Sequence, residues 1–267
     1  MCGVRSRGAT PRGDFMIAIL SDVHANLEAL EAVFKDLVQR NVKRIFFLGD
    51  ILGYGPDPVA VLEFIRHFEF SLLGNHDQAV LQGPPVTFNP VAQRATWWTR
   101  SQICPSEMTA AFLRRAEHEK RKQYWTYLLS LKPVRTVGET MFVHDDPGRP
   151  GSWKYLTKGG DVEQAFRSQP TIRAFFVGHS HLPAVWTEDE LIVPETGQRF
   201  EFNRRLLVNV GSVGQPRDKD PRAGYVILEP DGFRFFRVPY EIEKTQQKIL
   251  ANTELDPFLA ERLGKGI

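Results

Sequence analysis

Three short apolar segments in the first third of the chain end in the same way, on a side chain with an acceptor oxygen. Residues 16–20 lead to Asp22, residues 42–48 to Asp50, and residues 69–73 to Asn75. Parallel strands joined by helical crossovers bring their carboxyl ends to one edge of a sheet, where open α/β sheets build their sites. We therefore expect the three side chains to meet, with Asp50 in the middle.

The segments between these strands have the pattern of helices. Apolar residues recur at helical spacing over 27–38. A second helix is expected over 57–68, with Asp57 as its N-cap and Pro58 at its first helical position. The opening third is therefore predicted to be βαβαβ with a parallel sheet.

Residues 84–132 depart from this alternation and are predicted to form a helical insertion. Helices are expected near 91–101 and 106–130. Two interpretations fit the insertion. Its tryptophans and tyrosines pack it onto the body, or it caps the site and brings Arg94 or Arg100 to the substrate.

The chain after the insertion is expected to form a second, more mixed sheet. Its strands are predicted at 134–137, 140–143, 174–177, 184–188, 206–210, 223–229 and 232–238. A helix is expected near 161–168, and a polar C-terminal helix near 240–252 at the surface.

Composition limits the classes of function. At 267 residues the chain can bury one large core, so we expect one domain over 16–267 after a disordered extension over 1–15. A net charge of +2 argues against a nucleic-acid or membrane surface held by bulk electrostatics. The two cysteines form neither a disulfide framework nor a metal site. No apolar run reaches the about 18 residues of a membrane span, and we expect a cytoplasmic protein.

Most of the histidines also stand at predicted strand ends. The chain has seven, and five of them follow an expected strand beside a small or acidic residue: His24, His76, His144, His179 and His181. Together with two aspartates and an asparagine in matching places, this set is not explained by core packing. Imidazole and carboxylate ligands suit divalent transition metals, and the absence of cysteine argues against a structural zinc site.

These blocks resemble the calcineurin-like metallophosphoesterases. The matching blocks are Asp22-x-His24, Gly49-Asp50, Gly74-Asn75-His76-Asp77, His144 and Gly178-His179-x-His181. The stretches 49–58 and 209–223 are similar to the small prokaryotic phosphodiesterase-like branch. The resemblance covers nearly everything after Met16 except the insertion.

The resemblance implies a fold and a set of metal ligands. The fold would be a four-layer α-β-β-α sandwich of two mixed sheets with outer helices, here with a helical insertion. Asp50 would bridge two divalent transition metal ions, manganese or iron first, with zinc, nickel and cobalt also accommodated. The first ion would be held by Asp22, His24 and His181, and the second by Asn75, His144 and His179.

The resemblance also implies a reaction. A hydroxide bridging the two metals would attack phosphorus in line. His76 would face the leaving or a non-bridging oxygen as acid or charge stabiliser, and Asp77 would orient it. Asn75 supplies a neutral oxygen, which keeps the site attractive to phosphate.

Three further residues are candidate contacts of the substrate. Asp145 departs from the branch, where a glycine and a serine usually follow the histidine. We expect it to support the second metal or set specificity rather than to ligate, so that Asp145→Gly changes substrate preference and keeps both metals. Arg217 is expected to hold a substrate phosphate or to pair with Asp218 or Asp220. Tyr54 either lines the pocket or packs within its loop.

The sequence thus predicts a phosphoesterase acting on a small phosphodiester or phosphomonoester. Alternatives within enzymes are a dinucleoside polyphosphate hydrolase and a protein phosphatase. The alternative outside enzymes is a catalytically silent metal-binding scaffold, which the complete set of matched positions disfavours. The expected partner is a small phosphate ester, with no nucleic acid or membrane, and the oligomeric state is open.

Overall fold

The first apolar segments form the parallel half of a sheet. The computed structural model describes residues 16–106, 114–156 and 158–267, so the expected extension over 1–15 lies outside the described residues. The parallel strands are β1 (Ile17–Leu20), β2 (Arg44–Phe47) and β3 (Phe70–Ser71). They are joined by α1 (Leu27–Gln39) and α2 (Pro58–Ile65), which confirms the βαβαβ prediction. Asn26 caps α1 by accepting a hydrogen bond from the Ala29 N–H group.

Three later strands complete this sheet, and two of them, predicted at 223–229 and 232–238, were expected in the second sheet. β11 (Ala223–Glu229) pairs antiparallel with β1, β12 (Gly232–Val238) pairs with β11, and β9 (Arg199–Glu201) closes the edge. The predicted sheet for β11 was wrong because this strand is buried on both of its faces. Tyr225 packs under the outer helices and Val226 between the sheets. Such a pattern identifies a strand without identifying its neighbour.

The second sheet is mixed. Its order is β4-β5-β6-β10-β7-β8. The strands predicted at 134–137 and 140–143 are present as β4 (Val134–Val137) and β5 (Thr140–Val143), which pair antiparallel. The other strands are β6 (Ala174–Val177), β10 (Leu206–Asn209), β7 (Ala184–Trp186) and β8 (Leu191–Ile192).

Three apolar layers hold the sandwich together. Phe46, Phe142 and Phe176 belong to the layer between the two sheets. α1 and α2 cover the outer face of the first sheet, and α7 (Gly159–Ser168) covers the second. The four-layer α-β-β-α prediction is therefore confirmed.

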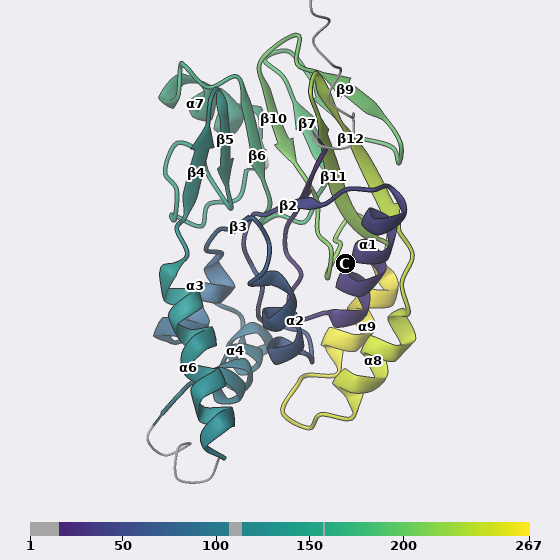
Figure 1. Ribbon diagram of the computed structural model, residues 1–267. Coiled ribbons are helices and arrows are strands. Elements are labelled where there is room, and N and C mark those ends of the chain that lie inside the picture. Colours follow the sequence, from purple (N-terminus) through teal and green to yellow (C-terminus); the bar gives the residue numbers. More distant parts are fainter. Residues whose placement is uncertain (1–15, 107–113, 157) are drawn as a thin grey trace, which may run out of the picture.

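The remaining helices gather at one end of the sandwich (Figure 1). They are α3 (Asn75–Gln82), α4 (Pro90–Ile103), α6 (Arg115–Ser130), α8 (Ile242–Leu250) and α9 (Phe258–Lys265). The helix expected over 106–130 is described only from Arg115, and residues 107–113 lie outside the described residues. α9 was not predicted.

The insertion and the C-terminal helices pack against each other. Trp98 of α4, Ile249 of α8 and Leu259 of α9 share a buried cluster with Tyr54. Arg94 donates to the Thr253 carbonyl, and Arg100 donates to the carbonyls of Val80 and Leu81. Both arginines are engaged by backbone carbonyls, which favours the interpretation that the insertion packs onto the body.

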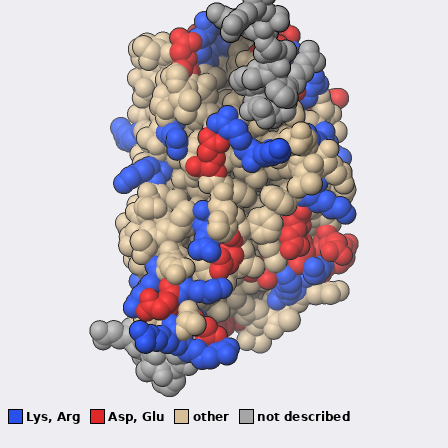
Figure 2. Space-filling view, in the orientation of Figure 1, with Lys and Arg blue, Asp and Glu red and all other residues tan. Residues whose placement is uncertain are grey.

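Surface charge is mixed on the face drawn in Figure 2, where blue and red side chains lie interspersed. The basic α6 illustrates this, because Lys120 pairs with Glu63 and Lys122 pairs with Glu119. Among the described residues, no helix is both long enough and apolar enough to cross a membrane.

Candidate metal centre

The residues of the centre leave their strands with left-handed backbone. Five of them have positive φ angles: Asp22 (54°), His24 (48°), Asp50 (60°), His179 (66°) and His181 (61°). Such conformations cost about 1–3 kcal/mol each and persist where the surroundings hold them. Here the Asp22 N–H donates to Gly49 and the His24 N–H to the Asp50 carbonyl, at 3.0 Å each. The strained turns therefore direct the side chains inward.

Two glycines allow the turns to lie against each other. A Cβ on Gly74 would stand 2.1 Å from Asp50 Oδ1, and one on Gly178 would stand 2.0 Å from Ser21 Oγ. Both contacts are far inside van der Waals distance, so a side chain at either position would push a strand end away from the centre.

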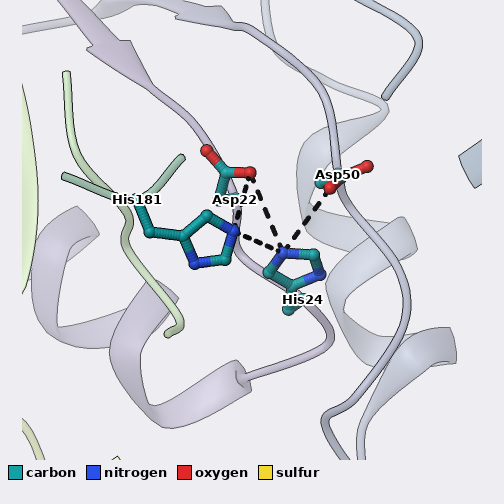
Figure 3. A group of neighbouring side chains, drawn as sticks. All are labelled: Asp22, His24, Asp50 and His181. Carbon is teal, nitrogen blue, oxygen red and sulfur yellow. Dashed lines mark hydrogen bonds and ion pairs between the residues drawn. The ribbon is translucent and has the colours of Figure 1, made fainter. Parts of the chain in front are cut away.

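Four buried side chains form the first half of the centre (Figure 3). His181 Nε2 lies 3.2 Å from Asp22 Oδ1, and His24 Nε2 lies 3.6 Å from Asp50 Oδ2. The two imidazole Nε2 atoms are 3.1 Å apart. One ligand atom from each of the four residues lies within 4.8 Å of the others, so a single ion can be reached by all of them.

The second half shares Asp50 with the first. Asp50, His144 and His179 also offer atoms within 4.8 Å of one another. His144 Nε2 lies 3.4 Å from Asp50 Oδ2 and 3.3 Å from Asn75 Oδ1. The predicted ligands thus fall into the two predicted groups, with Asp50 between them, as the assignment requires.

Each of the four candidate histidine ligands has one ring nitrogen at a backbone carbonyl. The contacts are His24 Nδ1 with Leu52 (2.9 Å), His144 Nδ1 with Leu48 (3.1 Å), His179 Nε2 with Trp153 (2.9 Å) and His181 Nδ1 with Gln215 (2.5 Å). A carbonyl only accepts, so we assign the proton to these nitrogens. The other nitrogen of each neutral ring then offers a lone pair to the centre, which is the arrangement of a metal-ligating histidine.

The electrostatics of the centre favour a cation. Asp22 Oδ1 is buried and has no hydrogen-bond partner among the described residues. Burial alone would raise the pKa of Asp22, yet His181 and His144 hold it below its usual range. Burial would lower the pKa of His144, but Asp50 and Asp22 raise it to about 10, so the two carboxylates attract a positive charge at this ring. A bound metal ion would supply that charge in place of the second ring proton and leave the ring neutral. Orphaned oxygen and facing lone pairs fit a divalent metal ion, and they fit no other partner in the described part of the chain.

His76 lies beside the centre and differs from the four histidines above. Its backbone N–H donates to Asp50 Oδ1 at 2.8 Å. Its ring stands 4.4 Å from the ring of Tyr54 and 4.7 Å from that of Phe88, between centroids. Its Nδ1 is buried without a hydrogen-bond partner among the described residues, and burial lowers its pKa to about 4. His76 therefore differs from the four histidines that have a backbone carbonyl at one ring nitrogen.

Asp77 does not orient His76, contrary to the prediction. Its carboxylate accepts from three backbone N–H groups, those of Asp50 (2.9 Å), Leu52 (3.1 Å) and Gly74 (3.1 Å). It sits in the first turn of α3, where its side chain faces back along the chain to the preceding loops. Asp77 therefore fixes the loop that carries Asp50.

Asp145 is buried and faces the loop that follows it. Its oxygens accept from the N–H groups of Gly151 (3.0 Å) and Trp153 (2.5 Å). The Trp153 indole in turn donates to Gln78 of α3 at 2.7 Å. Since the Trp153 carbonyl anchors His179, Asp145 acts on the second group through this loop and is not among its ligands.

Arg217 does not form the salt bridge that sequence analysis considered. Asp218 pairs with Arg237 and Asp220 with Arg222, while Arg217 Nη2 donates to Gln215 Oε1 at 2.9 Å. The backbone N–H of Arg217 also donates to the His181 carbonyl at 3.4 Å, which places the arginine beside a candidate ligand.

Tyr54 packs in a buried cluster and also lies beside the centre. It is buried in the cluster with α4, α8 and α9, and its ring lies 4.8 Å from that of His24. Sequence analysis missed Arg262 of α9, whose guanidinium stands 5.8 Å from the Tyr54 ring centroid. No motif surrounds Arg262, so only the packing of α9 could have identified it.

Comparison with known proteins agrees with this geometry. A family model described as "Calcineurin-like phosphoesterase superfamily domain" matches residues 15–232. An uncharacterized protein of Methanocaldococcus jannaschii is 36% identical over 256 residues, covering 94% of this chain and 98% of its own.

Solved structures show the same similarity. A metallophosphoesterase from Sphaerobacter thermophilus superposes with a TM-score of 0.79 at 36% identity, over 95% of this chain and 99% of the other. A hypothetical protein of Pyrococcus horikoshii superposes at 0.71 with 18% identity, over 94% and 98% of the two chains, and shows the shared fold.

Proposed function

Because the chain belongs to the calcineurin-like phosphoesterase superfamily, we propose that its buried centre binds two divalent metal ions and hydrolyses a small phosphate ester. The observation that carries this proposal is the sharing of the Asp50 carboxylate between two groups of buried ligand atoms. A metal-binding scaffold would need the two ligand groups but not His76, a neighbouring histidine without a carbonyl anchor.

The proposed ligands follow from the geometry. Asp22, His24 and His181 would hold one ion, Asn75, His144 and His179 the other, and Asp50 both. Nitrogen and oxygen donors in this ratio suit manganese or iron and also accept zinc, nickel or cobalt. Bound ions would neutralise phosphate charge and lower the pKa of a water molecule.

The protein contributes position and hydrogen bonding. Asn75 adds an oxygen without adding negative charge, which avoids repulsion of an anionic substrate. His76 stands against Tyr54 beside the ligand groups, and we assign its ring to a phosphoryl or leaving-group oxygen as donor. Asp77 and Asp145 hold the loops in place from outside the site.

The test pairs metal analysis with hydrolysis of bis(p-nitrophenyl) phosphate and p-nitrophenyl phosphate. Wild type, His76→Ala and Asp50→Ala are compared after reconstitution with manganese. We expect about two ions and turnover in wild type, metal without comparable turnover in His76→Ala, and loss of metal in Asp50→Ala. The ratio of the two rates then separates diesterase from monoesterase.

Two outcomes would count against the proposal. The first is that wild type binds metal but cleaves none of the compounds tested, which are these esters, dinucleoside polyphosphates and phosphoproteins. This result would indicate a scaffold. Unchanged metal content in Asp50→Ala would remove the bridging assignment.

A further inference from the structure

Two arginines stand beside the centre with guanidinium nitrogens left over. Arg217 Nη2 donates to Gln215 Oε1, and Arg217 Nε is buried with no hydrogen-bond partner among the described residues. Arg262 Nε donates to the main-chain oxygen of Ile267 at 2.6 Å, and its guanidinium lies over the rings of Tyr54 and Phe258, 5.8 and 5.6 Å from their centroids. In the described part of the chain, neither arginine pairs with an aspartate or glutamate side chain.

Two other arginines that are partly covered by the fold, Arg205 and Arg237, have acceptors for their guanidinium groups. Arg205 donates to the carbonyls of Ile172, Phe166 and Gln169. Arg237 is paired with Asp218. A guanidinium is shielded from water only at a cost unless acceptors replace the lost hydration, so Arg217 and Arg262 lack a partner that the others have.

Both arginines are linked to the centre, Arg217 through its backbone and Arg262 through the ring of Tyr54. Arg217 follows the Gln215 carbonyl that anchors His181, and its own N–H donates to His181. Arg262 reaches the centre through Tyr54, whose ring touches those of His24 and His76 at centroid distances of 4.8 and 4.4 Å. The charges of both guanidinium groups act on Tyr54, so the two groups lie on the same side of the centre, Arg217 on the loop after β10 and Arg262 on α9.

The two positive charges oppose each other. Burial and, after it, the charge of Arg217 together lower the pKa of Arg262 to about 10. Two bound divalent ions would add positive charge that the carboxylates of Asp22 and Asp50 only partly offset. A single phosphate dianion would not neutralise the combined positive charge of the metal ions and the two arginines. A second anionic group on the substrate would pair with both arginines.

We propose that Arg217 and Arg262 form an anion subsite that binds a second phosphate of the substrate while the first lies at the metal centre. This inference rests on the proposed function and narrows it to esters that carry two phosphate groups. A planar guanidinium offers paired N–H donors to phosphate, and two such groups favour the doubly charged species over a neutral or singly charged tail. Arg262 lies beyond residues 15–232, which the family model matches.

The subsite is tested by binding, so that its failure is separable from failure of catalysis. Methylene-, ethylene- and propylene-diphosphonate are titrated calorimetrically into the manganese-loaded protein, each against the monophosphonate of the same carbon chain. Wild type is expected to bind at least one diphosphonate about tenfold more tightly than its monophosphonate. Arg262→Gln should lose this preference, and Arg262→Lys should keep part of it.

Lys265→Gln is the matched control, because Lys265 lies on the same helix, is exposed and pairs with Glu261. It should keep the full preference, and circular dichroism melting should show that all variants are folded. Equal binding of mono- and diphosphonates by wild type, or equal weakening of both by Arg262→Gln, would overturn the subsite. Turnover of p-nitrophenyl esters in the same preparations would leave the proposed function standing in either case.

Discussion

The histidines of the centre are held by backbone carbonyls, and the loop that carries one of these carbonyls is built around Asp145. Asp145 accepts the N–H groups of Gly151 and Trp153, and Trp153 has a left-handed backbone with φ of 59°. The bonds from Asp145 offset the strain that this conformation costs. Asp145 is not among the candidate ligands, yet it fixes the loop that orients His179.

Replacing Asp145 by alanine is expected to weaken the ion bound at His179 while the ion at His24 and His181 stays. Loss of a residue that orients a ligand typically lowers metal affinity about 10–100-fold. The measurement is calorimetric titration of metal-depleted protein with manganese. This revises the sequence-based expectation that both metals are kept.

Asp146→Ala is the control for this experiment, because the neighbouring carboxylate accepts from Gly148 alone among the loop N–H groups. It should bind both ions with nearly wild-type affinity. If Asp145→Ala also binds both ions as wild type does, Asp145 serves the substrate rather than the centre.

Asp77→Asn tests the revised role of Asp77. One carboxylate oxygen becomes an NH₂ group, which cannot accept from the N–H groups of Asp50, Leu52 or Gly74. Leaving a buried donor unsatisfied costs about 1–3 kcal/mol, so the free energy of unfolding should fall by that amount. Urea unfolding measures it. A role limited to orienting His76 would instead leave stability unchanged and reduce only the rate.

At the scale of elements, a buried carboxylate ties the first helix to the last ones. Glu28 of α1 pairs with Lys248 of α8 at 2.6 Å and accepts from Thr245 at 3.0 Å. Lys248 also reaches Asp57, at the start of α2. Thr245 further bonds Asn26, which holds the Gly214 carbonyl. α8 is therefore anchored to the loops around the centre, although its outer face is polar.

Glu28→Gln should destabilise the protein in a pH-dependent way. Burial raises the pKa of Glu28, but the bonds from Lys248 and Thr245 outweigh it and the pKa is lowered. A carboxyl with a lowered pKa stabilises the fold above its unfolded value of about 4.3 and loses this contribution as the pH falls below it. The variant should be about 1–3 kcal/mol less stable than wild type at pH 7 and nearly equal near pH 3.

Urea unfolding at both pH values measures this difference, with Glu261→Gln as control. Glu261 pairs with Lys265 on an exposed helix face, so its replacement should change little at either pH. A constant difference between wild type and Glu28→Gln from pH 7 to pH 3 would mean that packing rather than charge gives Glu28 its effect.

The strands and helices of the first third follow from sequence because their contacts are local. Asp57 shows the limit of prediction from local pattern. It precedes α2 as expected, yet its side chain makes no capping hydrogen bond and pairs with Lys248 instead. The pairing of β11 with β1 joins residues far apart in sequence. The sequence did not predict α9, because its apolar residues are buried against those of α4 and α8. No local sequence pattern shows which distant helices pack together.

At the scale of the molecule, strand ends from both sheets converge on one site. The parallel-sheet argument placed Asp22, Asp50 and Asn75 together from sequence alone, and the histidines of the second sheet joined them through the resemblance. The anchoring carbonyls could not be predicted, because every residue carries one and the sequence does not record its direction. Arg262 depends on the packing of two helices that carry no motif.

Removing metal should therefore loosen the whole sandwich rather than one loop. The buried ligands come from the ends of β1 and β2 in one sheet and β5 and β6 in the other, so a bound ion links both sheets. A ligand that binds only the folded state at 100 times its dissociation constant stabilises it by about 2.7 kcal/mol. Treatment with a chelator should lower the melting temperature by several degrees, and manganese should restore it.

Asp50→Ala distinguishes this linkage from a general effect of the chelator. Without the shared carboxylate, the variant should melt at the same temperature with and without manganese, because neither group keeps its common ligand. A variant that responds to manganese as wild type does would show that the stabilising ion binds elsewhere. The size of the shift in wild type then measures how far the two sheets depend on the ions that we assign to their common edge.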